Sequence, residues 1–288
     1  GQKMASFSTG YAHDYFNLAV SGDHAETDGF KDADINGFKD ESSNNNSHIA
    51  LDLYPTEDIK ISLGRDHANV DTRYTGNMTR AEYKDDPAQN SASSYTHQKF
   101  HTDTVLFGIE AKLSNSFDVS YNHSQEDKTS NFVGSFLADY DYKSDEFLIK
   151  YQAEQFKITS GVQRFDGERS TYGAFGSDTT KENTGYFLQG EYFWNDMTFS
   201  LGGRKESVEY DYASSTANLD DEHDLYAYDF GINKRFTDEL TMFANFNKSF
   251  QAPDIDRFFN FGGSFNGFID PAKVKTLNIG FNYVTKND

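Results

Sequence analysis

The residues best suited to bind an ion form a short acidic stretch near the start of the chain. Asp32, Asp34 and Asn36 alternate along the sequence and a glycine follows them, as in the first half of a calcium-binding loop. Asp40 stands at the ninth position of such a loop, but the twelfth position lacks the bidentate glutamate that completes the ligand set. We therefore expect either a solvated acidic loop or a loop, between Ala25 and Ser47, that calcium orders.

A second group of residues has the chemistry to bind a bulky organic ligand. Aromatic rings and a few arginines occur in the polar segments of the chain, and such residues could line a pocket for an anionic ligand. The candidates are Arg169, Tyr172, Phe175, Arg257, Phe258, Phe259, Phe261 and Phe265. The alternative is that these rings pack one loop against another.

Other clusters of polar residues are weaker candidates. His97 and His101 lie in a segment that leads into a strand, where residues four apart are about 13 Å apart and too distant to share one ion. The acidic run 220–224 has the composition of a solvated loop tip. No phosphate-binding glycine loop, nucleophile elbow or zinc-protease helix occurs, so we expect no enzyme. An outer-membrane hydrolase on a small barrel is the one enzyme class that we keep open.

Composition narrows the classes of protein further. The 288 residues carry a net charge of −20, which disfavours nucleic acid as a partner, and they include no cysteine. Aromatic residues make up 16% of the chain, too many for a disordered protein. No apolar run is long enough for a membrane-spanning helix.

The elements that carry these residues follow a period of two. In the segment 186–194, apolar or aromatic residues alternate with a mixed, partly polar face, and a tight turn at Asn195 and Asp196 leads to a second segment of the same kind. This pattern recurs along the chain, and we count about thirteen strands. No linker divides them, so we expect one β-barrel region over residues 1–288.

The connections between the expected strands are of two kinds. Tight turns alternate with long polar segments, at 25–47, 69–100, 126–139, 167–183, 211–224 and 251–273. Short turns at one end and long loops at the other are typical of an antiparallel transmembrane β-barrel, whose apolar face meets lipid and whose polar face meets a watery lumen. A soluble β-sandwich is the alternative fold, because its strands also alternate.

Four segments resemble the TonB-dependent outer-membrane receptors. They are NKSFQAPDIDRFF at 247–259, DPAKVKTLNIGF at 270–281, TGYFLQGEY at 184–192 and ETDGF at 26–30. They occur in the order that the family shows, although Gln251 stands where arginine is common. The resemblance spans most of the chain.

The resemblance implies both a fold and a function. It implies about 13 strands of a barrel of about 22, with the plug domain, its TonB-contacting box and the C-terminal strands lying outside these residues. It implies a protein of the Gram-negative outer membrane, embedded in lipid, that binds a scarce metal chelate such as a ferric siderophore, or cobalamin, at external loops and depends on TonB for uptake. A passive porin or structural barrel remains the alternative function.

Overall fold

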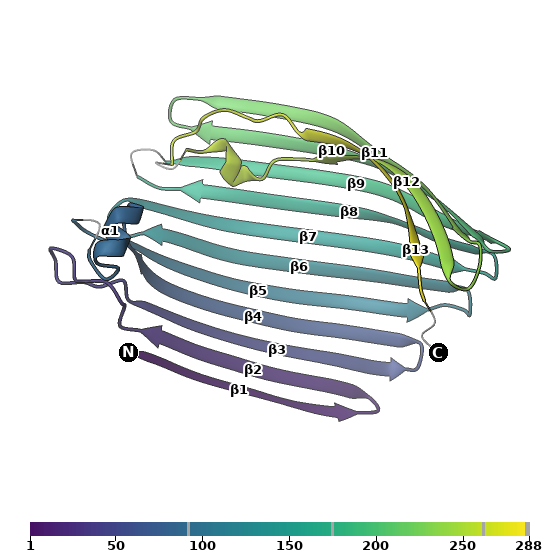
Figure 1. Ribbon diagram of the computed structural model, residues 1–288, viewed down its shortest axis with the longest axis horizontal. Coiled ribbons are helices and arrows are strands. Elements are labelled where there is room, and N and C mark those ends of the chain that lie inside the picture. Colours follow the sequence, from purple (N-terminus) through teal and green to yellow (C-terminus); the bar gives the residue numbers. More distant parts are fainter. Residues whose placement is uncertain (91–92, 174–175, 261–262, 286–288) are drawn as a thin grey trace.

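The computed structural model describes residues 1–90, 93–173, 176–260 and 263–285, and these form one sheet of 13 antiparallel strands in sequence order (Figure 1). The strands are β1 (Gln2–His13), β2 (Phe16–Thr27), β3 (Ser42–Thr56), β4 (Ile59–Tyr74), β5 (Thr96–Lys112), β6 (Phe117–Phe132), β7 (Phe136–Gln152), β8 (Phe156–Thr171), β9 (Ser177–Trp194), β10 (Met197–Ser214), β11 (Asn218–Arg235), β12 (Leu240–Gln251) and β13 (Ala272–Tyr283). Two short helices, α1 (Arg80–Asp85) and η1 (Ile255–Phe258), lie in connections between strands. The expected all-β fold and strand count are confirmed.

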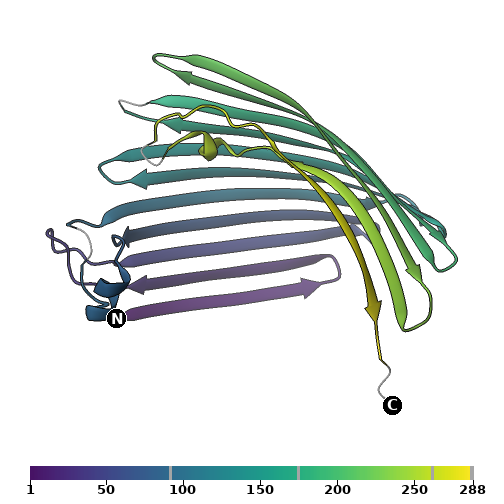
Figure 2. The same ribbon diagram turned by 45° about the horizontal axis from the view of Figure 1, so that its top comes forward.

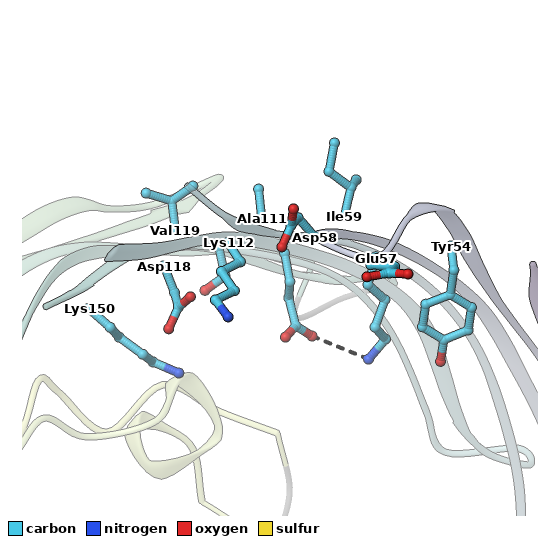
Figure 3. Close-up of a pocket in the computed structure, with 12 residues that line it drawn as sticks. Tyr54, Glu57, Asp58, Ile59, Ala111, Lys112, Asp118, Val119 and Lys150 are labelled. Carbon is cyan, nitrogen blue, oxygen red and sulfur yellow. Dashed lines mark hydrogen bonds and ion pairs between the residues drawn. The ribbon is translucent and has the colours of Figure 1, made fainter. Parts of the chain in front are cut away.

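The two faces of the sheet differ in chemistry, because side chains alternate along each strand and paired residues share a face. Figure 3 shows Lys112, Asp118 and Lys150 on the concave side, which we call the inner face, and Ala111 and Val119 on the opposite, outer face. Strand after strand carries exposed apolar side chains on the outer face. Among them are Leu18, Ile49, Leu63, Phe107, Ile149, Ile158, Leu188, Leu201, Phe230 and Ile279. We call this band the apolar belt.

The apolar belt covers only part of each strand. On β9 the outer face is apolar or aromatic from Tyr186 to Trp194, but in the other direction it carries Asp178, Thr180 and Glu182. The apolar part has the height of a lipid bilayer's core in an outer-membrane barrel, about 25 Å. The strands therefore continue beyond the lipid as a polar extension.

Connection lengths confirm one half of the sequence-based expectation and correct the other. Short turns occur at 14–15, 57–58, 113–116, 153–155, 195–196 and 236–239, all at one end of the sheet, the turn end. At the other end, the loop end, 28–41, 75–95 and 252–271 are long, but the expected long loops at 126–139, 167–183 and 211–224 are wrong. Their polar residues are mostly strand, because the strands continue above the lipid, where polar side chains occupy both faces.

The sheet is curled and open. Figures 1 and 2 show β12 and β13 curving forward, away from the plane of β1 to β6, while β1 and β13 remain the two unpaired edges. The sandwich alternative is wrong, since one sheet has no second sheet packed on it. Among the described residues, no helix is long and apolar enough to cross a membrane.

Candidate ligand-binding site

The connection between β12 and β13 folds inward against the sheet instead of projecting from it. The described parts of this segment, residues 252–260 and 263–271, include η1 and lie across the loop ends of the neighbouring strands in Figures 1 and 2. Ile255 and Phe258 are fully buried. Phe258 belongs to an apolar cluster made of Val208, Tyr210 and Leu225, with Phe250, Ala252, Phe259, Phe265 and Phe268 around it. We call residues 252–271 the inward segment.

A buried arginine fixes the inward segment to β7 and β8. The Nε atom of Arg169 lies 3.1 Å from the carboxylate of Asp256, and the guanidinium carbon lies 3.6 Å from the centre of the Phe259 ring. The Tyr140 hydroxyl donates a hydrogen bond of 2.9 Å to the same Asp256 carboxylate. Only 3% of the Arg169 side chain is exposed, and its guanidinium lies beside the Phe136 and Phe259 rings. Its Nε atom is within ion-pair distance of Asp256, although neither Nε nor Nη1 makes a hydrogen bond to the residues that the structure describes.

A backbone carbonyl provides the second anchor. The Lys181 ammonium and the Tyr210 hydroxyl both donate to the carbonyl oxygen of Pro253, at 2.9 and 2.8 Å. Both groups lie above the apolar belt. Burial lowers the pKa of Lys181 and raises that of Tyr210, so Tyr210 keeps its donor proton at neutral pH.

Beside these anchors, rings and lysines line the inner face. The Lys128 ammonium lies 4.1 Å from the centre of the Tyr140 ring and 5.4 Å from that of Tyr142. Lys181 lies 5.6 Å from the centre of the Phe165 ring. We call Phe100, Lys128, Tyr140, Tyr142, Phe165 and Lys181 the aromatic–lysine patch. Its side chains lie on the inner face. Tyr140 and Lys181 are held by Asp256 and Pro253 of the inward segment, so Lys128 is the patch cation that could contact a planar or anionic ligand.

The residues expected to bind ligand differ in how far the structure exposes them. Arg169 and Phe258 are buried in contacts with the protein, whereas Phe259 and Phe265 are partly buried on the inward segment. Tyr172 and Arg257 are exposed at the loop end. Phe175 and Phe261 lie outside the described residues. The ligand-binding role of this set stays a prediction.

The patch was missed from the sequence. Lys128 and Lys181 fall in the segments 126–139 and 167–183, which are expected to be loops and in which no face can be deduced, and Tyr140 directly follows the first of them. The signal that could have found them is alternation in phase with the strand below: Lys128 is an even number of residues from Asp118, which belongs to the polar face.

The acidic loop uses its carboxylates to bind backbone N–H groups of its own residues and of the neighbouring connection 75–95. Asp34 is buried and accepts hydrogen bonds from the backbone N–H groups of Asn36, Phe38 and Tyr95 at 2.9, 3.0 and 3.1 Å. Burial alone would raise the pKa of Asp34, but these three donors hold it below its ordinary value.

The remaining expected calcium ligands serve the same loop. Asp40 accepts from the N–H groups of Phe30 and Lys31 at 2.8 and 2.7 Å, and the carbonyl of Asp32 accepts from the Tyr95 hydroxyl at 2.6 Å. Asn36 is exposed. Calcium in this loop stays a prediction, and its ligands would have to exchange these backbone contacts for the ion.

Charged residues cover the inner face toward the turn end. A cavity of about 330 Å³ is lined there by residues of β3 to β7 and of the turn 57–58 (Figure 3). The Lys60 ammonium lies 3.2 Å from the Glu110 carboxylate. Higher on the same face, Arg204 donates to Glu206 and to Gln163, both at 2.6 Å. The lumen wall is therefore polar and internally paired.

Comparisons with known proteins agree with this architecture. A family model described as TonB dependent receptor-like, beta-barrel matches residues 4–288. No curated protein matches the chain. Among solved structures, the alcaligin outer membrane receptor FauA from Bordetella pertussis is 13% identical, with a TM-score of 0.70, and the match covers 97% of this chain and 45% of that chain.

Two further structures give the same result. The ferric-catecholate import receptor Fiu from E. coli K12 is 10% identical with a TM-score of 0.77, covering 98% of this chain and 54% of that one. The ferric yersiniabactin uptake receptor FyuA from Yersinia pestis is 13% identical with a TM-score of 0.70, and the match covers 98% of this chain and 50% of that one. The chain thus spans about half the length of the structures that it matches. It is a member of the TonB-dependent receptor family and forms part of the family's β-barrel, in the outer membrane of a Gram-negative bacterium.

Proposed function

We propose that the barrel containing this chain takes up a scarce metal chelate of the ferric siderophore kind, with cobalamin as the other candidate, and that passage across the membrane depends on TonB acting through a plug domain. The observation that carries the proposal is the aromatic–lysine patch, which places Lys128 and Lys181 among rings on the lumen side of the outer mouth. Cations beside aromatic faces suit a chelate that is anionic and carries flat groups.

The net charge of −20 does not oppose this choice at the patch itself. Many acidic residues lie on the outer face or at the loop tips, as Asp178, Glu182 and Asp220 do, whereas both patch lysines face the lumen. Charges separated by more than about 8–10 Å are largely screened at physiological salt. Glu126, Asp254 and Asp256 also act electrostatically on Tyr142, so the patch offers a ligand individual cations beside rings and not a net positive field.

The names of similar structures support the same class of ligand. FauA is named for alcaligin, Fiu for ferric catecholates and FyuA for ferric yersiniabactin. Their identity to this chain is low, so they support the class and not one compound. The apolar belt supports a lipid environment around the barrel.

The test is ligand binding to the receptor purified from outer membranes in detergent. Ferric catecholate, ferric hydroxamate and cyanocobalamin are titrated while intrinsic fluorescence is recorded. Replacing Lys128 with alanine should weaken binding of the preferred chelate about tenfold, which corresponds to about 1.4 kcal/mol. Lys128→Arg should retain most of the affinity, because the charge and the contact with the rings remain.

Lys143→Ala is the matched control, since Lys143 is a lysine of the neighbouring strand that lies on the outer face. It should bind the chelate as the unchanged receptor does. Equal affinity in Lys128→Ala and Lys143→Ala would remove the patch from the binding site. Failure of all three compounds to bind would reject the proposed ligand class.

A further inference from the structure

Three potential metal ligands meet on the outer face, away from the lumen. His67 of β4 pairs directly with Asp103 of β5, and His101 lies two residues from Asp103 on the same face. One ligand atom from each residue lies within 4.8 Å of the others. In the part of the chain that the structure describes, this is the only such group of three histidine or acidic side chains.

Hydrogen bonds already hold the three side chains together. The carboxylate of Asp103 lies 3.0 Å from Nδ1 of His67 and 2.8 Å from Nε2 of His101. Asn69 connects the other two ring nitrogens, with its amide nitrogen 2.6 Å from Nε2 of His67 and its oxygen 2.7 Å from Nδ1 of His101. The rings cross edge to face at 5.0 Å between centres. The ligand set is therefore ordered before any ion arrives.

Each ring nitrogen of the cluster already faces a hydrogen-bonding partner. His101 faces the Asp103 carboxylate and the Asn69 side-chain oxygen, and His67 faces the Asp103 carboxylate and the Asn69 amide nitrogen. A divalent ion would take the place of these hydrogen bonds, because metals bind imidazole nitrogen and carboxylate oxygen directly.

We propose that His67, His101 and Asp103 form a binding site for a divalent first-row transition ion, of which Zn²⁺ is the probe, on the outer face of the barrel wall. Two imidazoles and one carboxylate suit zinc and its neighbours in the series, whereas calcium and magnesium prefer all-oxygen sites. Three protein ligands leave at least one coordination position for water. The half-buried side chains need only small rotations to reach metal–ligand distances of about 2.0–2.2 Å.

The position of the site separates it from chelate uptake. Below it on the outer face, β4 and β5 carry Leu63, Val105 and Phe107 of the apolar belt. The site therefore lies where the polar extension begins, at the level of the outer-leaflet headgroups, and not on the path through the lumen. An ion bound there would be part of the barrel wall and would not be transported through the lumen.

Arg65 gives the site a competitor that can be tested. Its guanidinium lies 3.1 Å from Asp103, with 65% of its side chain exposed. A bound ion would repel this cation, which has room to rotate into solvent. Removing the arginine charge should therefore strengthen metal binding, an effect that loosely attached ions at scattered surface histidines would not show.

The experiment is calorimetric titration of Zn²⁺ into the receptor in detergent at neutral pH, with Mg²⁺ titrated in parallel. We expect saturable zinc binding, weakened at least tenfold by His67→Ala and by His101→Ala, and strengthened several-fold by Arg65→Gln. The controls are His97→Ala and His123→Ala, because each of these outer-face histidines pairs with one carboxylate, Asp71 or Asp145, at 2.6 and 2.8 Å.

The outcomes are distinct. Equal zinc affinity in the unchanged receptor and in His67→Ala, or the same loss in His123→Ala as in His67→Ala, would overturn the site. Heat-modifiable migration of each variant in gel electrophoresis shows that its barrel is folded. Chelate binding, measured on the same samples, should be unchanged by all five variants. A failure of the zinc site would therefore leave the proposed function untouched, and a failure of chelate binding would leave the zinc site untouched.

Discussion

Arg169 and Asp34 carry charges that a search for ligand-binding residues would select, yet both charges hold the protein's own loops in place. Arg169 neutralises Asp256 and stacks on Phe259. Asp34 satisfies three backbone donors that no strand partner reaches. A loop needs such partners because its backbone has no ladder of hydrogen bonds. Residue type therefore predicted the presence of charge in these loops but not its use.

The role of Asp34 predicts how its loop responds to amidation and acid. In Asp34→Asn the side-chain oxygen can still accept from Asn36 and Phe38, but the new NH₂ group cannot accept from the Tyr95 N–H, at 3.1 Å in the unchanged protein. We expect faster hydrogen exchange at Tyr95, measured by mass spectrometry. Asp32→Asn is the control, since the Tyr95 hydroxyl contacts the backbone of Asp32 and not its carboxylate.

The pH dependence has a definite sign. The folded pKa of Asp34 is lower than that of an unfolded aspartate, about 3.9. The stabilisation is therefore complete above that pH and is lost as the pH falls through the folded value. The protection of the Tyr95 N–H, meaning its exchange rate relative to an unstructured chain at the same pH, should fall only in acid below pH of about 4. A loss of protection between pH 5 and 7 would contradict this assignment.

The ion pair of Arg169 makes a second prediction at this scale. Asp256→Asn removes the partner charge and leaves Arg169 buried, so opening of the inward segment should become easier by about 1–3 kcal/mol. Limited proteolysis within 252–271 measures this opening. Asp254→Asn is a neighbouring control, because the Asp254 carboxylate accepts from the Ile255 N–H in its own turn and forms no ion pair with Arg169 within the described residues. Similar cleavage in both variants would show that the ion pair does not hold the segment.

Among the secondary-structure elements, alternation predicted the strands where one face is apolar and failed where both faces are polar. Residues 105–112 and 186–194 are strands as expected, because lipid imposes a strict pattern on their outer face. Above the belt, water surrounds both faces and the pattern disappears, although the hydrogen-bonded ladder continues, as between Glu126 and Tyr142. The patch could not be placed for the same reason.

Close contacts between strands predict the cost of adding one methyl group. A Cβ at Gly161 of β8 would lie 2.5 Å from the Phe147 carbonyl oxygen and 2.9 Å from the Phe187 ring. Gly161→Ala should therefore destabilise the barrel by about 1–3 kcal/mol. Gly203→Ala is the matched control, since a Cβ there meets no atom within 4 Å. The midpoint of heat-induced unfolding, followed by gel mobility, should fall for the first variant and not for the second.

For the molecule as a whole, the two open edges govern behaviour in a membrane. β1 and β13 each leave one side unpaired, and unpaired backbone groups are not tolerated in contact with lipid. Something must pair with both edges before the sheet can lie in a bilayer. The family predicts that further strands of the same barrel do so.

This requirement predicts the behaviour of the 288 residues expressed by themselves. Refolded in detergent, they should form aggregates or edge-to-edge assemblies, detected by light scattering, and should lack heat-modifiable migration. The barrel completed with the remaining family strands is the positive comparison. A monodisperse, heat-modifiable monomer of the 288 residues would show that the sheet closes on itself.

The polar extension of the strands also determines what the cell's surroundings can touch. On β9 the outer face is polar from Asp178 to Thr184, a length of about 20 Å at 3.3 Å per residue, or about 15 Å of height once strand tilt is included. The polar extension of the strands therefore projects from the lipid at the loop end of the sheet. The inward segment does not project with it but packs against the strands. Antibodies and phages would reach the strand tips, at 133–135 and 215–217, without touching the surface that we expect to receive nutrients.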